Sequence, residues 1–313
     1  MSSASQVTII TPVFEDRDAA KMLFGDLASV FGDRCYVVAV DDGSVRYPLS
    51  DDDLKQSNVS GAVIQLRRNV GHQRAIAIGL DYVAENRPDH TCIIMDSDGE
   101  DRVQAIENLL DALDRETVDV VVARRKSRVA SVTFRLFYFL YMQFFRFLTG
   151  QHINFGNFMA LRPLAIKRLV AMEEIWTHIA ASVLVSKLRI VQCDIDRGPR
   201  YAGKSKMNFS SLTLHGLRAF MVFAESVLVR VGTACALTAI LTVIGIIASV
   251  FLKFVGLATP GWFSISLGIL FLVLLQTGAL TLMSLMMTGI MRGRNQVTTQ
   301  YQDLIEEVYL VDA

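Results

Sequence analysis

The stretch Cys92-Ile93-Ile94-Met95-Asp96-Ser97-Asp98-Gly99-Glu100-Asp101 is an apolar run that stops at a cluster of carboxylates. An apolar run without polar alternation is typical of a strand that is buried on both faces of a parallel sheet. Such sheets place their functional groups just beyond the carboxyl ends of the strands. We therefore predict a buried strand that delivers Asp96 and Asp98 to the mouth of a cleft. Two carboxylates there can hold a divalent cation such as Mg2+ or Mn2+.

The Asp-x-Asp spacing alone carries little information, because the chain contains four such pairs. The other pairs are Asp16/Asp18, Asp51/Asp53 and Asp194/Asp196. Only Asp96 and Asp98 directly follow an apolar run long enough to be an interior strand. A solvated turn is the alternative, and the surrounding chain has to decide between the two.

Apolar, β-branched runs alternate with helical patterns along the first two thirds of the chain. The predicted strands cover residues 7–14, 36–40, 62–66, 118–123 and 188–193 in addition to the opening stretch, and residues 153–162 form a short loop or strand. Predicted helices cover about 18–30, 73–84, 103–113, 133–149 and 173–187. This alternation predicts an α/β fold with a mostly parallel sheet and helices on both of its faces.

The polar ends of parallel strands meet at one edge of the sheet. The residues gathered there are Asp41, Asp42, Asn69, Asp96, Asp98 and the basic run Arg124 to Arg128. Each has a simpler explanation: residues 41–44 as a turn, His72 as a helix cap or packing residue (the reading we favour for it), and the basic run as a solvated loop. Polar ends on four of five strands nevertheless indicate one site for an anionic ligand with a cation.

Composition and charge divide the chain into a soluble part and a membrane part. It has 313 residues with 31 basic and 31 acidic side chains, and its mean hydropathy of +0.37 is high for a soluble domain. The zero net charge argues against a nucleic-acid partner. The widely separated cysteines indicate reduced core residues, and the first residues do not resemble a cleaved signal peptide.

We predict a cytoplasmic catalytic domain at 1–206, an interfacial amphipathic helix at 207–230, a transmembrane domain at 231–291 and a cytoplasmic tail at 292–313. The spans cover Val231–Leu252 and Trp262–Met291, and each is long enough to cross a bilayer. Arginines flank one side, whereas the connector carries a single lysine, so the positive-inside rule leaves both termini of this integral membrane protein in the cytoplasm. Small residues in the spans would permit packing between copies in a homo-oligomer.

Two further segments suit a membrane surface. Residues 133–149 form an aromatic helix with only two charges, and it lies either at the membrane interface or inside the protein. Residues Arg197 to Lys206 form a basic, glycine-containing loop whose cations suit phosphate groups or anionic lipid head groups.

Taken in order, the motifs resemble those of family-2 glycosyltransferases. They are Thr11-Pro12-Val13-Phe14-Glu15-Asp16, Asp41-Asp42-Gly43-Ser44, Arg68-Asn69-Val70-Gly71-His72-Gln73-Arg74-Ala75, Met95-Asp96-Ser97-Asp98 and Arg200-Tyr201-Ala202-Gly203-Lys204-Ser205-Lys206. With two C-terminal spans, the chain resembles the polyprenyl-phosphate branch, which includes bactoprenol glucosyltransferases and, more distantly, dolichol-phosphate mannose synthase.

The resemblance implies a GT-A (Rossmann-like) fold, a nucleotide-diphosphate sugar donor and a divalent metal, Mg2+ or Mn2+. By position, Asp96 and Asp98 would bind the metal, with Asp98 as the main ligand. The residues expected to bind the nucleotide sugar are Pro12, Glu15, Asp41, Asp42, Asn69 and Asp96. Those for the donor and acceptor phosphates are Arg125, Arg128, Arg135, Lys204, Ser205 and Lys206, of which Arg125, Arg128 and Lys206 are also catalytic candidates.

The chain departs from the family pattern at three places. Gly99-Glu100-Asp101-Arg102-Val103 replaces Leu-Gln-Asp-Pro-Pro after the metal motif, and Met207 replaces the tyrosine that usually ends the basic loop. The Gln-x-x-Arg-Trp signature of processive synthases is absent from the sequence. These changes leave the two aspartates in place and affect the sugar and acceptor contacts.

The predicted function is an inverting transfer of a sugar, from UDP-glucose or a similar UDP-sugar, to a membrane polyprenyl phosphate. Its acceptor is already an anion, so no strong general base is needed. Two alternatives remain open. One is a glycosyltransferase that acts on another lipid such as diacylglycerol, and the other is a non-catalytic, membrane-anchored binding subunit.

Overall fold

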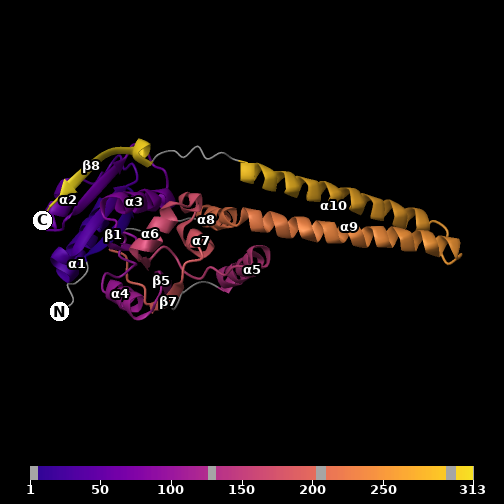
Figure 1. Cartoon of the computed structure of the whole chain (residues 1–313), viewed down its shortest axis with the longest axis horizontal. Helices are drawn as coiled ribbons and strands as arrows, with labels where there is room; N and C mark the ends of the chain where they lie inside the picture. Colours follow the sequence, from indigo (N-terminus) through magenta and orange to yellow (C-terminus); the bar gives the residue numbers. More distant parts are fainter. Residues whose placement is uncertain (1–5, 126–131, 202–208, 294–300, 313) are drawn as a thin grey trace. The chain divides into compact units, whose positions relative to one another are not determined.

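The computed structural model describes residues 6–125, 132–201, 209–293 and 301–312 (Figure 1). The chain divides into two compact units. The first comprises residues 1–138, 152–222 and 298–313, and we call it the sheet unit. The second comprises residues 139–151 and 223–297, and we call it the helical unit.

The sheet unit is built on an eight-stranded sheet with the order β7-β5-β6-β4-β1-β2-β3-β8. The strands are β1 Val7–Val13, β2 Cys35–Asp41, β3 Gly61–Leu66, β4 Thr91–Ile94, β5 Val120–Arg125, β6 Met159–Leu161, β7 Ile190–Ile195 and β8 Ile305–Val311. Strands β6 and β8 run antiparallel to their neighbours, and the other pairs are parallel. The predicted mostly parallel α/β sheet is therefore confirmed.

Helices cover both faces of this sheet. The helices of the sheet unit are α1 Arg17–Phe31, α2 Asp51–Gln56, α3 His72–Asn86, α4 Ala105–Arg115, α6 Pro163–Val170, α7 Ile179–Val185 and α8 Phe209–Val222, with short 3-10 turns η1 Gly32–Arg34, η2 Glu173–Trp176 and η3 Tyr301–Leu304. Helix α5, Val132–Thr149, continues from the sheet unit into the helical unit at residue 139. Successive β1 residues point to opposite faces, because Ile10 packs in the cluster that contains α3 whereas Ile9 packs in the one that contains α1 and α4. Each such isoleucine contributes about 1.5–3 kcal/mol by burial.

The structure differs from the predicted helices at several points. The short helices α2 and α6 were not predicted, and the helix expected over residues 173–187 is split into η2 and α7. The split occurs at His178, which is extended and accepts a hydrogen bond from the Ala181 N–H at 3.2 Å as the cap of α7. The single helix expected over residues 207–230 is also wrong, because the chain breaks at Phe223 between α8 and α9.

The C-terminal segment returns to the sheet. Residues 292–313 were expected to be a tail, yet β8 pairs antiparallel with β3 from Gly61↔Val311 to Leu66↔Ile305. In Figure 1 the yellow β8 lies along the indigo part of the sheet. The hydroxyl of Tyr301 donates to a carboxylate oxygen of Glu85 on α3. The last described residues therefore belong to the sheet unit.

The helical unit contains α9, Ala224–Phe254, and α10, Trp262–Gly293. Both helices are long and apolar enough to cross a membrane, and their most apolar stretches are almost entirely exposed. The two helices pack together, and the Ser284 hydroxyl on α10 donates to the Leu228 carbonyl on α9 at 2.6 Å. The predicted spans, 231–252 and 262–291, fall entirely within these two helices.

We predict that docking of the C-terminal segment depends on pH through Asp81, which lies one helical turn from Glu85. Burial and the charge of Glu85 raise the pKa of Asp81 to about 7. Because this pKa is raised, the stabilisation is complete below the unfolded-state pKa and is lost as pH rises through about 7. Intrinsic-rate-corrected amide exchange in residues 301–311 should then increase about tenfold between pH 6 and 8.

Asp81→Asn should abolish that increase, because the amide cannot ionise. The control is Asp114→Asn on the exposed face of α4, which should keep the wild-type profile. An unchanged pH profile in Asp81→Asn would contradict the prediction.

Candidate active site

Asp96 and Asp98 lie in the turn directly after β4, at the edge where the carboxyl ends of the parallel strands meet. This turn is tied by its own carboxylates. The Asp96 N–H donates to Asp101 Oδ2 at 3.2 Å, and the Glu100 N–H donates to Asp98 Oδ1 at 3.0 Å. Gly99 between them has a φ of +84°, a conformation that L side chains rarely adopt.

The side chain of His72 contacts Asp96, whereas we expected it to cap or pack at the start of its helix. Its Nε2 atom lies 2.8 Å from Asp96 Oδ1, so the first residue of α3 reaches the turn after β4. Desolvation by neighbouring groups disfavours the imidazolium, although 44% of the side chain is exposed. The carboxylates of Asp96, Asp42 and Asp101 outweigh this effect and hold the pKa of His72 above its ordinary value. The available signal was its position, since His72 follows β3 at the same edge of the sheet.

Asp98 contacts a cation from the segment after β7. Arg200 Nη2 lies 2.8 Å from Asp98 Oδ2, and Arg200 Nε lies 3.0 Å from Glu100 Oε1. We expected the loop from Arg197 to Lys206 to bind phosphate or lipid head groups. The structure instead gives Arg200 two carboxylate partners within the protein.

Residues 44–50, which follow β2, form a loop whose backbone is held by carboxylates. We call it the β2 loop. Asp41 accepts the N–H groups of Ser44 and Leu49, at 2.9 and 2.7 Å. The Glu15 carboxylate accepts the N–H groups of Val45, Arg46 and Tyr47, at 2.9, 3.1 and 3.2 Å. Asp53 accepts the Ser50 N–H at 2.9 Å. Because Pro48 has no N–H, every backbone donor of this loop binds a carboxylate.

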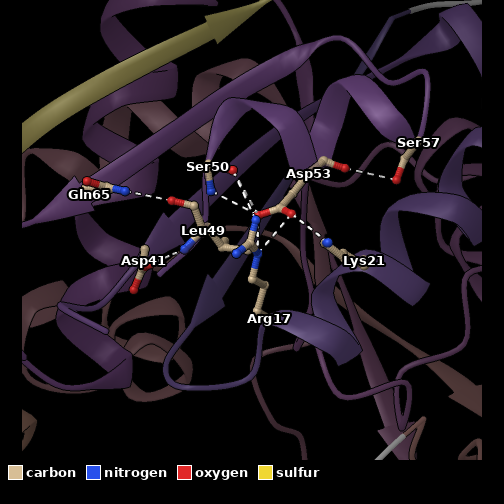
Figure 2. A network of polar contacts seen from close by, with 8 residues as sticks. All are labelled: Arg17, Lys21, Asp41, Leu49, Ser50, Asp53, Ser57 and Gln65. Carbon is tan, nitrogen blue, oxygen red and sulfur yellow. Dashed lines mark hydrogen bonds and ion pairs between the residues drawn. The ribbon is translucent and has the colours of Figure 1, made fainter. Parts of the chain in front are cut away.

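Asp53 is the centre of the network in Figure 2. Its carboxylate is fully buried and forms ion pairs with two cations on α1. Arg17 Nε lies at 2.9 Å and Lys21 Nζ at 3.1 Å. These cations, with the hydrogen bonds from Ser50, lower the pKa of Asp53 despite the opposing effect of burial. Removing a partner from a buried ion pair is costly, so this Asp-x-Asp pair has a structural role.

Asp42 is also directed into the protein. It is 3% exposed, and it accepts the N–H groups of Val70 and Gly71 at 2.7 and 3.0 Å. Burial raises its pKa. Gly43 approaches the backbone so closely that a Cβ there would lie 2.5 Å from the carbonyl carbon of Arg68. The loops after β2 and β3 are therefore joined through Asp42.

The remaining predicted residues are placed as follows. Pro12 is buried in β1 opposite Val40, and Asn69 is exposed after β3. Arg125 ends β5, where its backbone pairs with Ile195. The side chains of Arg125 and Arg135, and all of Arg128, Lys204, Ser205 and Lys206, lie outside what the structure describes. Their functional roles stay predictions, as do those of the other site residues.

The donor set at the site suits a hard divalent cation only in part. Asp96 and Asp98 supply carboxylate oxygens, which Mg2+ and Mn2+ prefer. Within the described residues no group of three or more His, Cys, Asp or Glu side chains is arranged to hold a metal ion. Further ligands would have to come from a bound molecule, as is common for Mg2+ at phosphate sites.

Comparison with known proteins gives consistent results. The model of the family described as Glycosyl transferase family 2 matches residues 8–174. An uncharacterised glycosyltransferase of Synechocystis is 27% identical over 303 residues, which cover 92% of this chain and 90% of that protein.

Solved structures show similarity at the level of the fold. Mannosyl-3-phosphoglycerate synthase from Rubrobacter xylanophilus has a TM-score of 0.51 and 14% identity, and the match covers 71% of this chain and 73% of that one. Glucosyl-3-phosphoglycerate synthase from Mycobacterium tuberculosis with Mn2+, UDP-glucose and phosphoglyceric acid gives 0.52 and 11%, covering 71% and 80%. The same enzyme with Mg2+ and UDP gives 0.50 and 10%, covering 71% and 79%.

We predict that Glu15→Gln loosens the β2 loop. The hydrogen bonds from the loop lower the pKa of Glu15, so the loop is held above the unfolded-state pKa and released as pH falls through the folded value. An amide side chain has one acceptor oxygen and no charge. Amide exchange at Val45, Arg46 and Tyr47 should therefore become about three- to tenfold faster at neutral pH.

The matched control is Asp16→Asn, which removes the neighbouring charge. Asp16 makes no side-chain cap hydrogen bond at the start of α1, so exchange in the β2 loop should stay at the wild-type rate. Equal exchange in Glu15→Gln and wild type would show that the loop does not depend on this carboxylate.

Proposed function

The chain belongs to glycosyl transferase family 2, and from that premise we propose that it transfers a sugar from a nucleotide-diphosphate sugar to a polyprenyl phosphate in a membrane. It is a glycosyltransferase with a GT-A fold. The observation that carries the lipid acceptor is the pair of apolar helices α9 and α10, whose side chains are largely exposed. A lipid surface is the environment in which such side chains are stable.

The proposed donor is a UDP-sugar, with UDP-glucose as the first candidate. The solved structures of similar fold contain UDP-glucose with Mn2+ or UDP with Mg2+. In this chain, Asp96 and Asp98 lie at the carboxyl edge of a parallel sheet, which is where nucleotides bind in such folds. The β2 loop places Val45 and Tyr47 at the surface of the same edge, 87% and 61% exposed.

The metal would be held by Asp96 and Asp98 together with the donor diphosphate. It would stabilise the negative charge that develops on the departing nucleotide diphosphate. The protein residues hold this position before any ligand arrives, because the turn after β4 is tied by Asp101 and Glu100.

The proposed reaction inverts the configuration at the sugar. A phosphate oxygen of the acceptor attacks the anomeric carbon, and the bond from that carbon to the diphosphate oxygen breaks. The nucleotide diphosphate leaves with the electron pair. Because the acceptor oxygen is already anionic, no proton has to be removed from it.

The acceptor would approach along the membrane surface. Beyond Tyr138, α5 exposes Phe139, Leu140, Phe144 and Phe147, whereas Phe145 is buried against the ring of Phe223 at a centroid distance of 5.7 Å. An aromatic face of this kind suits the interfacial region of a bilayer. The proposed partners of the acceptor phosphate are Arg125, Arg128, Arg135, Lys204, Ser205 and Lys206.

The proposed location is an integral membrane position with the sheet unit and both ends in the cytoplasm. Support comes from β8, because a chain that returns to its own sheet has crossed the bilayer an even number of times. Arg218 on α8 and Arg230 in the first part of α9 precede the apolar length of α9, whereas Lys253 lies in its last turn. This asymmetry agrees with the positive-inside rule.

The test is transfer of radiolabelled sugar from UDP-glucose into organic-extractable lipid, with polyprenyl phosphate or diacylglycerol as the acceptor. Wild type should label polyprenyl phosphate, and Asp98→Asn should lower the rate about a hundredfold or more. Asp51→Asn is the matched control from another Asp-x-Asp pair. Asp51 forms a solvent-accessible ion pair with Lys55, at 2.5 Å, so this variant should keep the wild-type rate.

Labelling of diacylglycerol in place of polyprenyl phosphate would favour the second lipid acceptor. No transfer from any common UDP- or GDP-sugar would contradict the catalytic proposal and favour a binding subunit. Retained transfer in Asp98→Asn would remove Asp98 from the metal site.

A further inference from the structure

The segment Arg197–Tyr201, which we call the strap, lies along the turn after β4. The Gly198 N–H donates to the Glu100 carbonyl at 2.9 Å, and the Tyr201 N–H donates to the Asp98 carbonyl at 2.9 Å. These backbone hydrogen bonds place the strap directly against the turn that carries Asp98.

Tyr201 anchors the strap independently of its two arginines, Arg197 and Arg200. Its ring covers Gly99 so closely that a Cβ at Gly99 would lie 2.6 Å from the ring. Its hydroxyl donates to Asp26 Oδ2 on α1 at 2.5 Å, and burial raises the pKa of Tyr201. The position of the strap is therefore maintained by packing and by neutral donors.

The two arginines of the strap share Glu100 as a partner and differ at Asp98. Arg197 pairs with Glu100. Arg200 pairs with both Glu100 Oε1, at 3.0 Å, and Asp98 Oδ2, at 2.8 Å. The side chains of Asp98 and Arg200 are 14% and 26% exposed, so solvent screens this pair less than a surface pair.

We propose that Arg200 is a positioning residue, the internal counter-cation of Asp98 in the metal-free protein, and that it leaves Asp98 when a divalent cation binds. This inference rests on the proposed function, which assigns the metal to Asp98. A metal ion and the guanidinium need the same carboxylate oxygen, so they compete for it. Arg200 also holds the Asp98 carboxylate in place before the metal arrives.

The competition sets the direction of the expected effect. Removing Arg200 leaves Asp98 without this cation, so Mn2+ should bind more tightly. A purely structural Arg200 would give the opposite result, because its loss would disorder the turn and weaken Mn2+ binding.

The experiment is a titration of the full-length protein in detergent with Mn2+, in which free Mn2+ is followed by electron paramagnetic resonance. Arg200→Gln should lower the Kd for Mn2+ about fivefold relative to wild type. Arg200→Lys, which retains the charge, should return the Kd to within about twofold of wild type.

Arg197→Gln is the matched control, because it removes one positive charge from the same strap without a partner on Asp98. Its Kd should change by less than about twofold. Amide exchange at Gly198 and Tyr201 should stay protected in all three variants, because the backbone hydrogen bonds and Tyr201 hold the strap.

If the Kd of Arg200→Gln for Mn2+ equals or exceeds that of wild type while the strap stays protected, the proposed replacement of Arg200 by the metal is wrong. The proposed function is not affected by that outcome. A gain of equal size in Arg197→Gln would also overturn the proposed replacement, because the effect would then be one of general charge. If wild type binds no Mn2+ even with saturating UDP, the metal assignment in the proposed function fails together with this inference.

Discussion

Several carboxylates lie close together at one edge of the sheet, and the surrounding structure has to compensate the repulsion between them. Like charges at such spacing disfavour each other's ionised form. Glu15, Asp41 and Asp42 are compensated by backbone N–H groups, which cannot leave unless the loops change conformation. Asp96 and Asp98 also face the side chains of His72 and Arg200, which can move while the backbone stays in place. The edge is thus divided into a permanent part after β1 and β2 and an exchangeable part after β4.

The strands of the sheet could be predicted because most are uninterrupted apolar runs, and a strand buried on both faces needs no other signal. Strand β8 could not, because Glu306 and Glu307 interrupt its pattern and its partner β3 lies more than two hundred residues away along the chain. The composition of residues 51–56 does not predict helix α2 either. Its start is defined by a capping box between Ser50 and Asp53, but the helix has only six residues, which is too short for periodicity to identify it. The break at Phe223 lies in the short apolar run 219–224, between Arg218 and Glu225, which contains no proline or glycine to mark a boundary.

The site could be predicted to the level of which strand ends contribute to it, but not to the level of which atoms face a ligand. Context selected Asp96 and Asp98 from four similar pairs, and the structure gives Asp53 a separate role in holding α1 to α2. The sequence shows that Glu15 and Asp41 are acidic residues after strands. It does not show that their oxygens accept N–H groups from the β2 loop, because those donors become neighbours only in the folded chain. The same holds for Arg200, whose charge is visible in the sequence whereas its partner Asp98 is not.

The pairing of β3 with β8 also constrains the membrane arrangement more strongly than charge does. The chain leaves the sheet unit after residue 222 and re-enters it at residue 298, and both β3 and β8 must lie on the same side of any bilayer. The two apolar helices between them can therefore make two crossings or none, but not one. A single crossing would separate strands that share a ladder of backbone hydrogen bonds, and each of those broken bonds would have to be satisfied elsewhere. If the helices make two crossings, the distribution of arginine and lysine decides only the side of the membrane on which the sheet unit lies.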